Sequence, residues 1–252
     1  MSRNLSFYGS KSTIEEAINN QNDVALFLSK LLFSTKAKHS NSVFSPASVT
    51  AALTLVASGP DDPSISKEIL SFLNSSSVDD LNAVFSEIAS VVLADRSANG
   101  GPKISSVNGV WIEQSLRIDS SFKDLFVNFF KASFDRVDFR SKAEEVRVEL
   151  NTWASNHTNG LIRDLLPPGS ITKSTDLVYG NALYFKGEWE VPFDKSHTRN
   201  EKFHLVNGGS VSVPFMSSVK KLYVEAYDGF KVLKLPYRQG SCGDEEDTNG
   251  GF

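Results

Sequence analysis

The sequence predicts an α+β fold, with helices in the first part and strands gathered in the second. Three observations predict it. Apolar residues recur at helical spacing in most segments before residue 160. After residue 177 the pattern changes to a continuous apolar run and short strand-like stretches separated by Asn-Gly and Asp-Gly turns. The composition, 40% hydrophobic and 22% charged, is that of a globular chain that can bury a core.

Two helices are predicted near the N-terminus. Residues 12–15 have the spacing of a capping box, and the apolar residues after them form one helical stripe as far as Phe33. A second helix begins at Ser45 and Pro46, because the serine can accept hydrogen bonds from free backbone amides and proline suits the first helical position. Small residues crowd this helix, which predicts a central buried element that ends at 59–60.

The middle of the chain alternates loops with regular elements. Ser and Asn cluster in residues 71–80, and residues 97–102 combine Ser, Asn, Gly and Pro, so both segments predict loops. Residues 104–116 have the β-branched content of a strand. The next helix starts at Ser120 and carries a core-facing stripe of Phe122, Leu125, Phe126 and Phe129.

A further helix is predicted from a capping box at 141–144 to a left-handed stop at 159–160. The apolar run 178–185 then predicts a strand covered on both faces. Asn181 lies inside this run and would be a buried amide, which needs a partner because an unpaired buried group costs about 1–3 kcal/mol. Two hairpins follow, 201–206 with 211–216 and 222–227 with 230–235.

No local motif carries hydrolytic, nucleotide or metal chemistry, so we predict neither an enzyme nor a cofactor. His197 and His204 lie near Asp194 and Glu201, but their spacing favours a solvated strand over a metal site. Cys242, the one cysteine, has no neighbouring histidine or cation cluster to activate it as a nucleophile. The net charge of −4 has the wrong sign for a nucleic-acid or anionic-membrane partner.

The N-terminal residues lack the apolar stretch of a signal peptide, and no segment approaches 18 uncharged apolar residues. We therefore expect a cytoplasmic or nucleocytoplasmic protein without a membrane anchor. The acidic tail at 240–251 has the composition of a flexible loop. Nothing in the sequence indicates an oligomeric state.

Several segments together resemble the serpins, and the plant serpins most closely. They are 41–49 (NSVFSPASV), 108–111 (NGVW), 144–147, 151–153, 159–167, and 181–189 (NALYFKGEW) with 192–193 after it. The run at 181–189 is the most specific. The segments keep their order and cover nearly the whole chain. The resemblance implies one serpin-like domain over residues 1–252, with N-terminal helices packed on a large central β-sheet and with smaller sheets.

The resemblance also implies an inhibitor of serine or cysteine endopeptidases that acts once. In the family, an exposed reactive-centre loop is cleaved and then inserts into the large sheet as an extra strand. By position, Ser45, Ser48 and Asn181 resemble the shutter residues beneath the opening of the sheet. Gly187 and Trp189 resemble the breach, where insertion begins. The histidine that partners the shutter asparagine in the family is encoded further along than this sequence.

The 252 residues contain no small-residue hinge pattern, so no reactive bond is assigned. We expect an incomplete serpin domain that lacks the reactive-centre loop and the last strands, and that does not inhibit on its own. Two alternatives stay open, namely the incomplete sequence of a functional inhibitor and a serpin remnant that binds other proteins. Family analogy adds an extracellular location as an alternative. An open edge at 178–185 would make the chain marginally stable and prone to aggregate.

Overall fold

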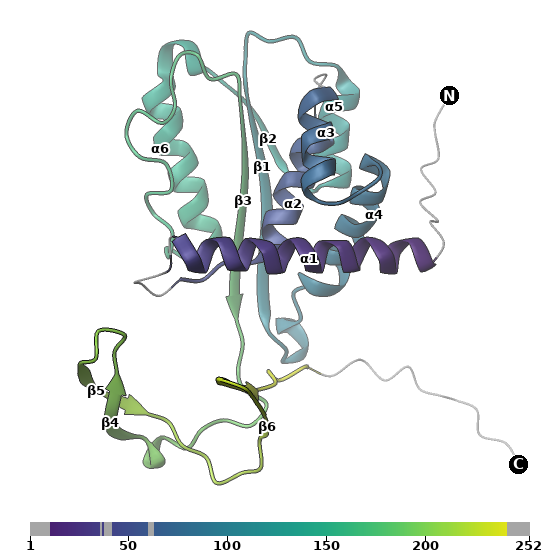
Figure 1. Cartoon of the computed structure of the whole chain (residues 1–252). Coiled ribbons are helices and arrows are strands. Elements are labelled where there is room, and N and C mark those ends of the chain that lie inside the picture. The colour runs from purple at the N-terminus through teal and green to yellow at the C-terminus, as the bar shows by residue number, and fades with distance from the viewer. Residues whose placement is uncertain (1–10, 36, 38–41, 60–62, 241–252) are drawn as a thin grey trace, which may run out of the picture. The chain divides into compact units, whose positions relative to one another are not determined.

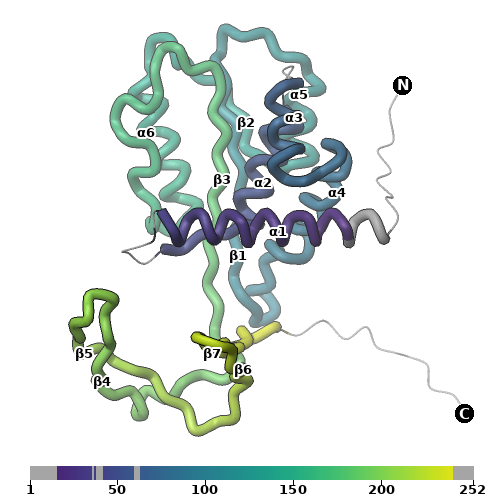
Figure 2. The backbone as a smooth tube through the Cα atoms, viewed as in Figure 1, coloured from purple at the N-terminus to yellow at the C-terminus, as the bar shows by residue number. Residues whose placement is uncertain are grey.

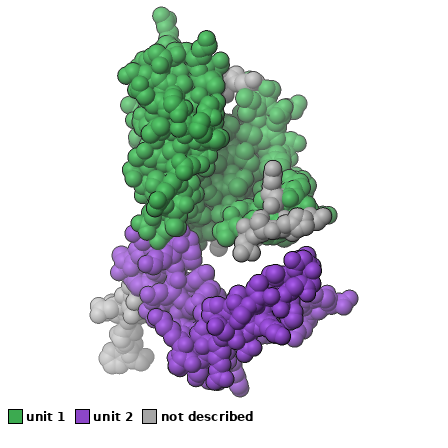
Figure 3. All heavy atoms as spheres, turned by 90° about the vertical axis from the view of Figure 1, so that its left-hand side faces the viewer, with its two compact units in different colours: residues 1–94, 104–184 green, residues 95–103, 185–252 purple. Residues whose placement is uncertain are grey.

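A computed structural model describes residues 11–35, 37, 42–59 and 63–240, with side chains from residue 16 onward. The chain divides into two compact units (Figure 3). The first comprises residues 1–94 and 104–184, and the second comprises residues 95–103 and 185–252.

The first unit contains six helices and a three-stranded sheet among its described residues (Figure 1). The helices are α1 (Lys11–Thr35), α2 (Pro46–Ala57), α3 (Pro63–Phe72), α4 (Val78–Glu87), α5 (Ser120–Asp124) and α6 (Phe139–His157). Two of them continue into π-helical turns, α4 into Ile88–Val92 and α5 into Leu125–Phe129. The strands are β1 (Lys103–Glu113), β2 (Ser133–Val137) and β3 (Leu177–Lys186).

The sheet has the order β2-β1-β3, so β1 is the central strand. β1 pairs with β2 in parallel, from Gly109 opposite Ser133 to Glu113 opposite Val137. The backbone N–H of Glu113 donates to the carbonyl of Asp176 at 2.9 Å, which ties the end of β1 to the start of β3. Among the described residues, β3 has one strand neighbour, and its other edge carries no strand.

The two faces of the sheet belong to two separate apolar clusters, as the alternation of side chains along a strand requires. Val110 and Tyr179 pack with α2 and with the Phe-rich helix after residue 120. Trp111 and Val178, each adjacent in sequence to one of these, pack instead with Val146 and Leu150 of α6. The tube in Figure 2 shows α6 on one side of the strands and α2, α3, α4 and α5 on the other, while α1 runs across the strands in this view. A third cluster joins α1 to α4 around Leu73 and Leu81.

The second unit consists mainly of two hairpins. β4 (Arg199–His204) pairs with β5 (Ser210–Phe215), and β6 (Tyr223–Tyr227) pairs with β7 (Phe230–Lys234) around a turn with Gly229 at φ 84°. Short 3-10 turns lie at Ser97–Asn99 and Lys195–His197. Nearly all residues of the four strands are exposed, including large apolar ones such as Tyr223 and Phe230.

The predicted elements are found at nearly their predicted positions, with three corrections. The loop predicted at 71–80 ends early, because Ser77 accepts from the Asp80 amide at 3.1 Å and caps α4. α6 begins two residues before the predicted capping box, because Asp138 is the N-cap and accepts from the Ser141 amide at 2.9 Å. β3 is not covered on both faces: most of its residues are partly exposed, and only Ala182 is buried.

Three sequence features lie outside what the structure describes. They are the capping box at 12–15, whose side chains are not described, the acidic tail beyond residue 240, and Cys242. Within the described residues, no helix is long and apolar enough to span a membrane.

Candidate functional site

The predicted helix start at Ser45 is found, and it positions a serine beneath the sheet. Ser45 has extended backbone angles, and its hydroxyl oxygen accepts a hydrogen bond from the Ser48 amide at 3.2 Å. Pro46 occupies the first helical position. This cap fixes the first turn of α2, so the side chain of Ser48 projects from a rigid turn.

Ser48 and Asn181 are in contact, although 133 residues separate them in the sequence. The Ser48 hydroxyl donates to Oδ1 of Asn181. Nδ2 of Asn181 donates in turn to Oδ1 of Asn108 on β1 at 2.9 Å. Nδ2 of Asn108 then donates to the carbonyl of Phe130 at 3.1 Å. Hydrogen bonds therefore run without interruption from α2 across β3 and β1 to the turn before β2.

Asn108 is the site residue that sequence reasoning missed. It is 7% exposed, so its amide depends on the partners that Asn181 and Phe130 supply. Asn181 itself is only partly buried, which corrects the prediction of a buried amide. The need for partners was predicted correctly, and the hydroxyl of Ser48 and the carbonyl oxygen of Asn108 fill that need. The Ser48–Asn181–Asn108 network is called the amide network below.

The predicted breach residues lie together in the second unit. The ring of Trp189 stacks on Tyr237, with centroids 4.5 Å apart and planes at 11°. A Cβ atom placed on Gly187 would lie 2.7 Å from Cδ1 of Tyr237, so a glycine is needed for this close approach. The segments also pair through their backbones, because Arg238 N–H donates to Glu188 O at 2.8 Å. Tyr237 completes this site and was not predicted.

Several buried polar atoms mark the first unit. Glu113 is 1% exposed, and hydrogen bonds from the backbone N–H of Ser115 are the main cause that holds the pKa of its carboxyl below the ordinary value. Burial raises the pKa of the Tyr179 hydroxyl, which has no hydrogen-bond partner in the described chain. Thr54 Oγ1 and Trp153 Nε1 are also buried and have no hydrogen-bond partner in the described chain.

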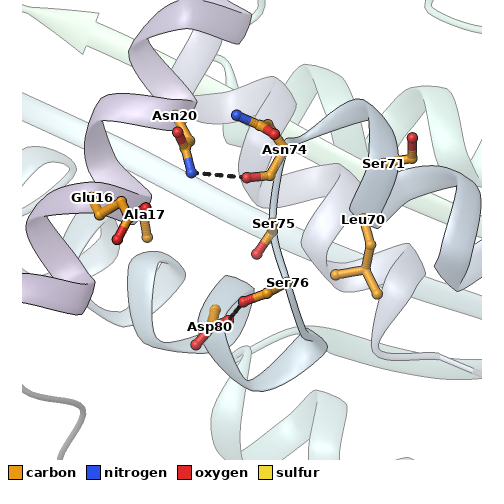
Figure 4. Close-up of a pocket in the computed structure, with 9 residues that line it drawn as sticks. All are labelled: Glu16, Ala17, Asn20, Leu70, Ser71, Asn74, Ser75, Ser76 and Asp80. Atoms are coloured by element: carbon orange, nitrogen blue, oxygen red, sulfur yellow. Dashed lines mark hydrogen bonds between the residues drawn. The ribbon is translucent and has the colours of Figure 1, made fainter.

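A polar pocket of about 410 Å³ lies between α1, the α3–α4 connection and the start of α4 (Figure 4). Asn20 Nδ2 donates to the carbonyl of Asn74 at 3.0 Å, and the Ser76 hydroxyl donates to Asp80. None of the predicted site residues lines this pocket. Over the ranges that the structure describes, no group of three or more His, Cys, Asp or Glu side chains is placed to hold a metal ion.

Residues 19–243 match the family described as Serpin (serine protease inhibitor). The chain belongs to the serpin family. It is 59% identical to Serpin-Z2 of Arabidopsis thaliana over 96% of the chain, and 61% identical to a probable non-inhibitory serpin-Z5 of the same plant over 95%. These matches cover 58% and 55% of the two relatives, so the chain spans little more than half of their length.

The serpin fold is also seen by comparison with solved structures. The native stressed conformation of Arabidopsis AtSerpin1 gives a TM-score of 0.82 at 50% sequence identity. The match covers 92% of this chain and 58% of that structure. The sequence and the fold therefore agree on a plant serpin, and the family is that of protease inhibitors.

Proposed function

We propose that residues 1–252 form the part of a plant serpin that accepts the inserted strand, and that they do not inhibit a protease on their own. The single observation that carries the proposal is the edge of β3 that pairs with no strand among the described residues. An unpaired strand edge presents a row of N–H and C=O groups, and an extended segment gains backbone hydrogen bonds by adding to it. From the family alone, we propose serine or cysteine endopeptidases as the partners of the whole serpin, and we propose that the chain itself is not an enzyme.

The amide network supports this proposal by its position. Asn181 lies on the strand that carries the free edge, and its side chain reaches both α2 and β1. Hydrogen bonds of this kind hold β3 against the helix beneath it. We propose that Ser45, Ser48 and Asn181, with Asn108, act as a shutter that sets how readily the edge of β3 accepts a strand.

We further propose that Gly187 and Trp189 form the breach where insertion starts. The stacked Trp189 and Tyr237 rings would have to separate for a strand to pass between the segments that carry them. An aromatic pair is worth about 0.5–1.5 kcal/mol beyond the area it buries. A contact of this strength can hold the segments of Trp189 and Tyr237 together, and it can break when a strand inserts between them.

The proposal is tested with the polypeptide 1–252 and two proteases, trypsin as a serine type and papain as a cysteine type. After incubation, a denaturing gel should show intact or degraded chain and no SDS-stable complex. A covalent complex with either protease would overturn the non-inhibitory part of the proposal. Catalytically inactivated protease serves as the control, because it can bind but cannot form an acyl bond.

A second hypothesis is a functional inhibitor that is encoded by a longer sequence. Reading the transcript past the codon for Phe252 distinguishes this hypothesis from the first. An in-frame continuation with a small-residue hinge favours the second hypothesis, and the product of the longer sequence should then form the SDS-stable complex.

The 61% identity to a probable non-inhibitory serpin-Z5 favours a third hypothesis, a binding protein without inhibition. A search for partners of the chain 1–252 other than proteases tests that hypothesis. We propose a cytoplasmic or nucleocytoplasmic location, with secretion as the alternative.

A further inference from the structure

Asparagine is followed directly by glycine four times in the described part of the chain. Three of these pairs lie in exposed turns, at 99–100, 159–160 and 207–208. Their glycines have φ of 82°, 75° and 83°, so the left-handed backbone explains why glycine is present. The fourth pair, Asn108 and Gly109, lies inside β1, where the backbone is extended and open to any residue. Another constraint must keep glycine there.

That constraint on Gly109 is the indole of Trp111. A Cβ atom placed on Gly109 would lie 2.7 Å from Cζ3 and 3.1 Å from Cζ2 of this ring. The ring is buried and packs with Val146 and Leu150 of α6. Because interiors are close-packed, the ring cannot move aside without disturbing these neighbours. Gly109 is therefore required by packing.

Asn108 is fixed by a different constraint, the amide network. Its Oδ1 accepts from Nδ2 of Asn181 at 2.9 Å, and its Nδ2 donates to the carbonyl of Phe130 at 3.1 Å. An aspartate would turn an acceptor towards the Phe130 carbonyl, and an apolar residue would leave that carbonyl without this donor. Two unrelated contacts thus place an Asn-Gly pair in the central strand.

An Asn-Gly pair can react with itself, because glycine offers the least steric hindrance to ring closure. The glycine nitrogen loses its proton and attacks Cγ of the asparagine. A new C–N bond forms, the bond from Cγ to Nδ2 breaks, and Nδ2 leaves as ammonia. Water then opens the cyclic imide at either carbonyl and gives aspartate or isoaspartate. Water is consumed, ammonia is released, and nothing is oxidised or reduced.

The folded sheet opposes this reaction at Asn108. Both polar atoms of the side-chain amide are held by partners on other elements, so Cγ is not free to turn towards the Gly109 nitrogen. Gly109 also lies in the part of β1 that pairs with β2, opposite Ser133. The reaction therefore needs a local opening in which Asn108 leaves its partners.

We propose that Asn108 is a site of spontaneous deamidation guarded by Asn181, so that an opening of the amide network is recorded as a permanent change in the chain. An aspartate at 108 sets an acceptor against the Phe130 carbonyl. An isoaspartate lengthens the backbone of β1 by a methylene group and shifts Gly109 relative to Ser133. Neither product rebuilds the network. This inference goes beyond the proposed function, since neither a protease nor an inserted strand takes part.

Peptide mapping by mass spectrometry tests the guard. The chain 1–252 is incubated in warm, mildly alkaline buffer, and deamidation is followed at Asn108 and at the exposed Asn207. In the folded chain Asn207 should react well before Asn108, because exposed turns open more easily than a central strand. In urea both should react at similar rates. Equal rates at the two sites without urea would overturn the proposal.

The variant Asn181→Ala tests the residue that acts as guard. It removes the donor to Oδ1 of Asn108, so deamidation there should rise about tenfold or more. Asn207 belongs to the other unit and should keep its rate. An unchanged rate at Asn108 would overturn the role of Asn181. Equal acceleration at both sites would also overturn it, because the whole fold would then be the protection.

Two more variants keep this test decisive. Asn156→Ala, exposed on α6, is the matched control and should leave both rates unchanged. Ser48→Ala removes the donor to Oδ1 of Asn181, so it should accelerate Asn108 less than Asn181→Ala does. This second variant decides the case in which Asn181→Ala does not fold, and an unchanged rate at Asn108 in it would then contradict the guard.

The variant Gly109→Ala tests the ring closure. The measurement is made in urea, where the clash with Trp111 no longer matters. The added methyl group hinders ring closure, so deamidation at Asn108 should slow several-fold, and the isoaspartate detected by enzymatic methylation should fall with it. An unchanged rate would assign the modification to direct hydrolysis of the side chain and would overturn the proposed step.

Discussion

The indole of Trp111 lies edge-on against the indole of Trp153, with ring centroids 5.0 Å apart and ring planes at 85°. Two glycines make room for it. A Cβ atom would lie 2.7 Å from Cζ3 of Trp111 if placed on Gly109, and 2.8 Å from the same atom if placed on Gly180. β1, β3 and α6 therefore meet at one aromatic contact, on the face of the sheet opposite to Asn181.

Gly109→Ala and Gly180→Ala should each destabilise the first unit by about 1–3 kcal/mol, because a methyl group there must displace the Trp111 ring. Urea unfolding followed by far-ultraviolet dichroism measures the change. Trp111→Phe in the Gly109→Ala background should restore part of the loss, since the shorter ring does not reach the new methyl group. An unchanged midpoint for Gly109→Ala would show that the indole is not held in this position.

Trp153→Ala should destabilise the chain by about 3–5 kcal/mol, since it removes a large side chain through which α6 packs against Trp111. Trp153→Phe should cost less, because it keeps an aromatic edge and removes an indole N–H that is buried without a partner among the described residues. Both are measured by chemical denaturation. Two variants of equal cost would contradict a specific edge-to-face contact.

Asn181→Ala should destabilise the first unit by about 1–3 kcal/mol, because the buried Asn108 loses the donor to its carbonyl oxygen and Ser48 loses an acceptor. Asn181→Asp should be worse at neutral pH, since it faces the Asn108 oxygen with a second acceptor. Asn156→Ala, exposed on α6, is the matched control and should stay within about 0.5 kcal/mol. The denaturant midpoints of the three variants measure these differences in stability.

Local chemistry predicted the start of α2, because Ser45 and Pro46 carry a complete helix signal in adjacent residues. It also predicted that Asn181 needs partners, because an amide inside an apolar run is costly unless it is hydrogen-bonded. It could not supply Asn108, whose role depends on a contact across 73 residues of chain. Glu113 was missed for the same reason: a charged residue at the end of a strand is usually solvated, and its burial follows from where α6 begins.

The start of α6 was predicted two residues late because two polar residues competed for the cap. Asp138 accepts from Ser141 and takes the role that the sequence pattern assigned to the serine. Glu144, expected to complete a capping box, bonds instead to Arg147 at 2.9 Å. A longer-range contact decided between the candidates, since Phe139 must present its N–H to Glu113.

Acid should weaken the cap of α6. Hydrogen bonds from Ser141 hold the pKa of Asp138 below its ordinary value of 3.8. A depressed folded-state pKa means that the stabilisation is complete above the ordinary value and is lost as the pH falls through the folded one. Asp138→Asn should therefore be less stable than the parent at about pH 6, and the difference should vanish near about pH 2.

Urea unfolding at the two pH values measures this difference, and Asp135→Asn is the control because Asp135 is exposed on β2. A difference between Asp138→Asn and the parent that is as large in acid as near neutrality would show that the charge of Asp138 contributes nothing to the cap.

The central place of β1 has a consequence for synthesis of the chain. β1 leaves the ribosome before either of its sheet neighbours, and its partner β3 pairs with it across a separation of 73 residues at Asn108 and Asn181. At about 5–20 residues per second, β1 waits on the order of 4–15 seconds for β3 to appear. Throughout that interval β1 has at most one neighbouring strand, so the apolar side chains of Val110 and Trp111 on its two faces are incompletely covered. We therefore expect chaperones to bind the growing chain at this stage.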